Sequence, residues 1–208
     1  MALAQILADF RSSVTQCDNL IANAHRADIN GVPLLPVIDQ RQITVAAFLN
    51  LFIAWESFLE AALADLMTGA VPASGNAPVK FVAPPTISAA NQMVIGVMRH
   101  FDYANHINVR KIVGLYFQAG YPFEPHLGAI YSDLDDLRTL RNASAHISTT
   151  TQTALEGLAT RVFGQPRPDI ALYEFITAID PRSGVAKEPV FITYRNKLIV
   201  TAELIAAG

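Results

Sequence analysis

The sequence predicts an all-α protein, and three observations point to that class. Apolar residues recur at spacings of three and four along most of the 208 residues, which is the period of an amphipathic helix. Glycine and proline gather in short groups that separate these periodic stretches. The composition, 51% hydrophobic and 16% charged, is typical of a folded globular protein and excludes intrinsic disorder. At this length we expect a single domain over residues 1–208.

The first two helices are the best defined by their pattern. Residues 3–24 keep the helical spacing throughout, and Gly31, Pro33 and Pro36 then break it. A second helix begins after Pro36, ends near residue 67 and confines its polar and small residues to one narrow stripe. Its most apolar stretch, residues 45–55, is shorter than the roughly 18 to 20 apolar residues that a membrane span needs. We therefore expect a central buried helix and no association with a membrane.

Shorter helices follow an irregular segment. Residues 69–86 hold two glycines and four prolines, which predicts an insertion loop between helices. The last segment is helical in spacing but rich in β-branched residues, so a short C-terminal hairpin is the minor alternative there. Turns are expected at residues 164–169 and 184–189. The later helices are expected over residues 87–103, 108–119, 125–147, about 149–163 and 191–207.

Charge and cysteine content restrict the function. A formal net charge of −3 gives no general attraction to nucleic acid, so any RNA contact must come from a local basic cluster. The single cysteine, Cys17, permits no internal disulfide and fits a reducing cytoplasm, and the N-terminus lacks the basic opening of a signal peptide. The chain has no Walker-type glycine loop, no dinucleotide fingerprint and no metal-ligand spacing of histidines. We expect a cytoplasmic protein without a metal or another cofactor.

A cationic cluster near the end of the predicted helix 125–147 carries the chemistry. The apolar stripe of this helix passes through Leu137 and continues by its period onto Arg141. A buried guanidinium needs a carboxylate, a partner chain or an anionic ligand such as phosphate. Asn142 and His146 are one turn apart and share a neighbouring face. Histidine can move protons near neutral pH and arginine can hold phosphoryl oxygens, as metal-independent RNA cleavage through the 2′-hydroxyl requires.

The run that ends in these residues resembles the signature of the HEPN superfamily. Arg141, Asn142 and His146 match its arginine, its polar residue and, after three more positions, its histidine. The resemblance covers most of the chain, including Trp55 and Glu56 of the hydrophobic second helix, and is greatest to stand-alone prokaryotic HEPN proteins of the RiboL-PSP type. It implies a HEPN-like helical bundle and a metal-independent endoribonuclease that acts as a toxin or defence effector. It also implies a homodimer with a composite active site and allows for an antitoxin or another regulatory protein.

Each candidate residue has an assigned role. We assign His146 as general base or acid, Arg141 as phosphate clamp and transition-state stabiliser, and Asn142 as orienting hydrogen-bond partner. Glu56 lies at the edge of the polar stripe of the second helix, where it could support Arg141 or His146 or make a structural ion pair. Arg138 could line a basic rim that binds RNA, or make an ordinary surface pair.

Three alternatives stay open from the sequence. The first is a catalytically silent HEPN module that binds a nucleotide or a partner protein through the same surface. In the second, Arg141 and His146 only interact with the carbonyls and the dipole of the last helical turn. The third is a structural subunit in which Arg141 pairs with Glu56. Since Arg141 and His146 do not share one face of a helix, a composite site across a two-fold dimer fits better than a site within one chain.

Overall fold

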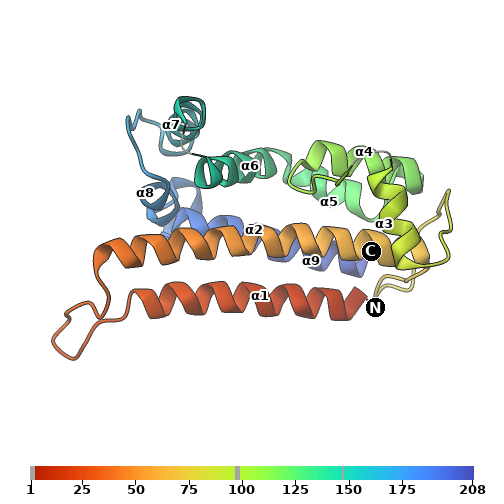
Figure 1. Cartoon of the computed structure of the whole chain (residues 1–208), viewed down its shortest axis with the longest axis horizontal. Helices are drawn as coiled ribbons and strands as arrows, with labels where there is room; N and C mark the ends of the chain where they lie inside the picture. The colour runs from red at the N-terminus through yellow and green to blue at the C-terminus, as the bar shows by residue number, and fades with distance from the viewer. Residues whose placement is uncertain (1–2, 97–98, 147) are drawn as a thin grey trace. The chain divides into compact units, whose positions relative to one another are not determined.

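The computed structural model describes residues 3–96, 99–146 and 148–208, and these residues form an all-α fold (Figure 1). Among them there is no strand, only isolated bridges such as Lys80 to Phe117. The predicted fold class is therefore confirmed. The elements are α1 (Leu3–Ala24), α2 (Val37–Thr68), α3 (Ile87–Ile95), α4 (His106–Tyr116), the 3₁₀ helix η1 (Gln118–Gly120), α5 (Phe123–Ala129), α6 (Tyr131–Ala145), α7 (Thr149–Phe163), α8 (Leu172–Thr177), the 3₁₀ helix η2 (Pro181–Ala186) and α9 (Val190–Ala207).

Contacts within the chain group it into two compact units. Helices α1, α2, α6 and α9 contribute residues to both units, whereas every other helix belongs to one of them. A single domain over residues 1–208 stays a prediction. Unit 1 consists of Met1–Arg11, Ala54–Leu134 and Lys197–Gly208, and unit 2 consists of Ser12–Ile53 and Asp135–Asn196.

An aromatic cluster forms the centre of unit 1. The ring of Phe10 on α1 lies 6.1 Å from that of Trp55 and 5.4 Å from that of Phe58, centroid to centroid, and both partners are on α2. All three side chains are buried. An ion pair of 2.5 Å between Arg11 and Glu203 joins α1 to α9. Within this unit the start of α1 therefore packs against the second half of α2 and beside the end of α9 (Figure 1).

The same three helices also meet within unit 2. The His25 ring, just after α1, lies 3.1 Å from the hydroxyl of Thr44 on α2. Arg195 of α9 donates to the carboxylate of Asp18 on α1 at 2.7 Å. Cys17, next to Asp18, is buried, and this burial together with the negative charge of Asp18 raises the pKa of its thiol. In both units, α1, α2 and α9 thus form the framework to which the shorter helices are added.

Helix α2 is the most apolar element. Among the described residues it is the one helix that is long and apolar enough to cross a membrane by length and composition, and 44% of its most apolar window is buried within the protein. The core helix of a soluble protein passes the same test, so this finding is weak evidence for a membrane span.

The middle helices differ from the expected ranges. The helix expected over residues 87–103 ends at Ile95, because Gly96 adopts a positive φ of 60° and its N–H caps the carbonyl of Gln92. The next helix begins earlier than expected, at His106, where the side chain of Asn105 accepts a hydrogen bond from the N–H of Asn108. The loop at residues 69–86 is present as expected, and Lys80 anchors it by donating to the carbonyl of Met67 at 3.1 Å.

The expected helix over residues 125–147 is wrong, because it is two helices. At Ile130 the backbone has φ −113° and ψ 27°, and this residue separates α5 from α6. Ile147 lies outside the described residues. The alternative of a C-terminal hairpin is also wrong, since Val190–Ala207 is the continuous helix α9. Helix α7 begins after Ser148 and ends at Phe163 as expected, whereas α8 was not predicted.

The buried indole of Trp55 tests the packing of unit 1. Trp55→Ala should lower the free energy of unfolding by about 3–5 kcal/mol, because it leaves a cavity beside Phe10 and Phe58. Ile53→Ala is the matched control on the same helix, since Ile53 is 57% exposed and should change stability by no more than about 0.5 kcal/mol. Urea unfolding followed by circular dichroism measures both variants. Equal losses of unfolding free energy in Trp55→Ala and Ile53→Ala would show that this aromatic cluster does not dominate the core.

Candidate functional site

The helix that carries the candidate residues, α6, is anchored by Asp136. Its carboxylate is 4% exposed and accepts a hydrogen bond of 2.7 Å from the hydroxyl of Tyr194 on α9. Arg161 of α7 pairs with the other oxygen, and a guanidinium nitrogen of Arg182, in η2, lies 3.8 Å from the carboxylate. Three segments of unit 2 therefore converge on one buried group of α6.

The electrostatics of this anchor combine two opposing effects. Burial raises the pKa of Asp136 above its ordinary value. The hydrogen bond from Tyr194 and the positive charges of Arg161 and Arg182 lower that pKa, but they offset the effect of burial only in part. Burial also raises the pKa of Tyr194, so its hydroxyl keeps the proton that it donates to Asp136 at neutral pH.

The buried face of α6 leaves Arg141 at its edge. Asp136, Leu137 and Leu140 are buried, whereas Arg138 and Arg141 are partly exposed. The predicted continuation of the apolar stripe onto Arg141 thus differs from the structure, in which the stripe continues onto Leu140. Leu140 and Arg141 follow Leu137 by three and four residues, so helical spacing allows either position, and the packing of α6 buries Leu140.

The structure brings Arg141 and Asn142 together. A guanidinium nitrogen of Arg141 donates to the side-chain oxygen of Asn142 at 3.4 Å. Within unit 2, no carboxylate of a described residue pairs with Arg138 or Arg141. This partly exposed end of α6 thus presents two guanidinium groups whose charge is not neutralised there.

His146 follows the last residue of α6 and is held by its backbone. Its N–H donates to the carbonyl of Asn142 at 3.0 Å, and its carbonyl accepts from the hydroxyl of Thr151 at 2.6 Å. The hydroxyl of Ser144 donates to the carbonyl of Arg141 at 2.6 Å. These bonds satisfy carbonyls at the helix end without the side chains of Arg141 or His146. The His146 side chain is exposed and available for chemistry.

The hydroxyl of Thr151 has a positioning role that the sequence did not reveal. Thr151 and Ser148 form the capping box at the start of α7, and the same Thr151 hydroxyl lies within hydrogen-bond distance of the carbonyl of His146. The spacing of Ser148 and Thr151 signals a helix start, but only the folded turn shows that the cap reaches back to His146. Helix α7 thereby fixes the backbone position of the candidate histidine.

Glu56 lies outside the unit that holds the other candidates. It is partly buried on the portion of α2 that belongs to unit 1, whereas Arg138, Arg141, Asn142 and His146 belong to unit 2. Its supporting role beside Arg141 or His146 stays a prediction.

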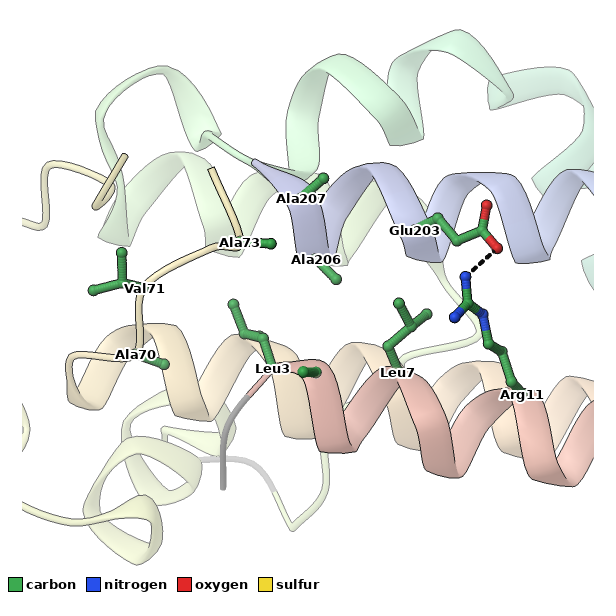
Figure 2. A pocket seen from close by; sticks show the side chains of 10 residues that line it. Leu3, Leu7, Arg11, Ala70, Val71, Ala73, Glu203, Ala206 and Ala207 are labelled. Carbon is green, nitrogen blue, oxygen red and sulfur yellow. Dashed lines mark hydrogen bonds and ion pairs between the residues drawn. The ribbon is translucent and has the colours of Figure 1, made fainter. Parts of the chain in front are cut away.

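A separate hollow lies in unit 1. Figure 2 shows this hollow of about 500 Å³, which is lined mainly by alanine, leucine and valine side chains and has the Arg11–Glu203 ion pair at one end. The described residues that line it include no histidine and no nucleophile. Across the described part of the chain, no group of three or more histidine, cysteine, aspartate or glutamate residues could hold a metal ion.

The chain matches no protein-family model, no curated protein and no solved structure. A functional conclusion therefore depends on the chemistry of the residues at the end of α6.

The Asp136 anchor gives a prediction with a pH dependence. Tyr194→Phe should lower the free energy of unfolding by about 2 kcal/mol at pH 7, because it removes a hydrogen bond to a buried carboxylate. It should also raise the pKa of Asp136 further, since the Tyr194 hydroxyl favours the ionised form. Chemical denaturation and side-chain carboxyl NMR measure the two effects.

The direction of the pH dependence follows from the raised pKa of Asp136. A carboxyl whose pKa is higher in the folded state contributes most stability below its unfolded pKa of about 3.9, and loses it as the pH rises through the folded value. The loss of unfolding free energy in Tyr194→Phe should therefore grow between about pH 4 and pH 7. Tyr173→Phe is the control, because no described residue hydrogen-bonds to the Tyr173 hydroxyl. A pH-independent loss would contradict the assignment.

Proposed function

We propose that the chain is a metal-independent endoribonuclease of the HEPN type, with Arg141, Asn142 and His146 at its active site. Its place of action is the cytoplasm, where it serves as a toxin or defence effector. The observation that carries the proposal is the combination at the end of α6: two guanidinium groups without a carboxylate partner in their unit, next to an exposed histidine whose backbone is fixed at both ends.

The chemistry assigns one step to each side chain. His146 takes the proton from a ribose 2′-hydroxyl, whose oxygen then attacks the adjacent phosphorus. The bond to the 5′-oxygen breaks, and this oxygen receives a proton from a water molecule, whose hydroxide takes back the proton that His146 accepted. The products are a 2′,3′-cyclic phosphate and a free 5′-hydroxyl. Arg141 stabilises the negative charge that develops on the phosphoryl oxygens. Asn142 orients Arg141 through the 3.4 Å hydrogen bond.

Local charge supports RNA as the substrate despite the net charge of −3. Arg138 and Arg141 are one turn apart on α6, and neither is neutralised within its unit. Backbone phosphates of RNA would provide the missing negative charge. Arg138 contributes to binding and positioning, and it takes no part in the proton transfers.

Two copies of the chain supply the complete site. Ideal helical geometry places Arg141 and His146 about 140° apart around the helix axis, so one copy does not direct both side chains at one phosphate. A two-fold dimer brings two α6 ends together, and Arg141 of one protomer then acts with the partner's His146. A regulatory protein that covered this end of α6 would act as an antitoxin.

Cleavage of a structured RNA in EDTA tests the proposed activity. His146→Ala should lower the rate at least about 100-fold, since it removes the general base. Arg141→Ala should lower it by about 100- to 1,000-fold, since it removes stabilisation of the transition state. Arg138→Ala should mainly weaken RNA binding and reduce its salt dependence. Gel analysis with detection of the cyclic phosphate measures the products.

The controls separate this site from contamination and from misfolding. Arg99→Ala and His100→Ala alter an exposed cation and an exposed imidazole outside the site and should retain full activity. An RNA with a 2′-deoxy sugar at the cleaved position should be resistant. Cleavage that persists in folded His146→Ala would remove the site from the mechanism. No cleavage of several RNAs by wild type would favour a silent module that binds a nucleotide or a partner protein.

The composite site predicts complementation between inactive variants. When His146→Ala and Arg141→Ala proteins are mixed and allowed to exchange subunits, half of the dimers are mixed, and each mixed dimer holds one intact site of two. Activity should recover to about a quarter of the wild-type value. Sedimentation of the wild-type protein should show a dimer. A monomeric active enzyme, or a mixture without recovery despite proven exchange, would contradict the composite site.

A further inference from the structure

A second hollow, of about 440 Å³, lies within unit 2 and is independent of the proposed RNA site. It is formed by α1, α2, α8 and α9, and its apolar lining includes Ile21, Ile176, Phe191 and Ile192. Ligand pockets in proteins commonly have roughly 300–1,000 Å³, apolar walls and a few placed polar groups. The hollow has the size and the walls of such a pocket.

Two aromatic rings of the hollow are held in place before any ligand binds. The ring of Tyr173 is covered by the guanidinium of Arg41, whose carbon lies 5.4 Å from the ring centroid. The ring of His25 is nearly parallel to it, with an interplanar angle of 15° and centroids 6.4 Å apart. Stacking on such fixed rings costs little ordering of the protein, so a flat aromatic molecule suits the hollow.

His25 offers a hydrogen-bond acceptor to this space. The Thr44 hydroxyl donates to the carbonyl of Gln40 at 2.8 Å, so its oxygen can only accept from the His25 ring nitrogen Nε2 at 3.1 Å. The proton of the neutral ring therefore resides on Nε2, and Nδ1 keeps its lone pair. No hydrogen bond to Nδ1 from a described residue is present. A ligand with an N–H group would satisfy this acceptor.

The charged residues of the hollow form one ion pair. Arg195 donates to Asp18 at 2.7 Å and, through Nε and Nη2, to the side-chain oxygen of Asn196 at 3.2 and 2.8 Å. The carboxylate of Asp18 thus neutralises the guanidinium of Arg195, and the pair as a whole carries no net charge. The guanidinium of Arg41 over the Tyr173 ring is a further cation beside the hollow.

We propose that this hollow binds a planar heteroaromatic molecule that carries an N–H donor. The ring lies against Tyr173 and the apolar wall, and the N–H donates to Nδ1 of His25. Indole is the simplest probe with these properties. Benzofuran has the same shape without the N–H.

Chemical-shift titration of the full-length protein tests this assignment. Indole should bind saturably, shifting the resonances of Tyr173 and Ile176. Benzofuran should bind about tenfold more weakly, because Nδ1 of His25 then stays without a donor. No saturable shifts with indole, or equal affinities for indole and benzofuran, would overturn the proposal.

His25→Phe keeps an aromatic ring but lacks Nδ1, and it provides the specific variant. It should weaken indole binding about tenfold and leave benzofuran binding unchanged. Thermal unfolding of the variant checks that the fold is retained. If the variant does not fold, Tyr173→Leu serves instead, and it should weaken the binding of both molecules. An unchanged preference for indole in folded His25→Phe would exclude His25 as the acceptor.

Discussion

The position of the candidate active site depends on the interaction of the Asp136 carboxylate with Tyr194, Arg161 and Arg182. It is the point at which α7, η2 and α9 all contact the same residue of α6. Directed hydrogen bonds fix the rotation of a helix more sharply than apolar contacts, which tolerate sliding. The buried positions Leu137 and Leu140 then follow on the same side, and Arg138 and Arg141 are left toward solvent.

The buried carboxylate of Asp136 selects one orientation of α6 over others, and it contributes less to the overall free energy of unfolding. Taking Asp136 out of water is costly, as its raised pKa shows, and the three partners offset that cost only in part. Any arrangement that left Asp136 buried without these partners would be less stable still. The network therefore selects one orientation of α6, and Thr151 adds the corresponding constraint on the backbone of His146.

Most of the helical content could be predicted from the sequence, because the long helices have a periodic pattern that local physics fixes. Helices α1, α2 and α7 begin and end close to the expected positions, helped by proline before α2 and by the Ser148 cap. The division between α5 and α6 was missed because the apolar spacing runs across it, and the single Gly128, two residues before Ile130, is a weak signal inside a helical pattern. The six-residue helix α8 is too short to show a period.

For the candidate site, the sequence indicated the residue types but not their surroundings. Arg141, Asn142 and His146 are indicated by their spacing; the structure joins the side chains of Arg141 and Asn142 on α6 and places His146 just after the end of this helix. The exposure of Arg141 could not be predicted, because helical spacing from Leu137 allows either residue 140 or residue 141 to be buried, and only the packing of α6 selects Leu140. The Ser144 hydroxyl bonds to the carbonyl of Arg141 within α6, whereas the bond from Thr151 to the carbonyl of His146 joins the start of α7 to the end of α6.

Burial of Cys17 has a consequence for spectroscopy. The thiolate is the reactive form of cysteine, and the raised pKa together with the covered position leaves Cys17 protonated and out of reach of reagents. A cysteine introduced at an exposed position would therefore react selectively with a maleimide dye or spin label. The native chain thus accepts a single probe near the end of α6 without removal of its own thiol.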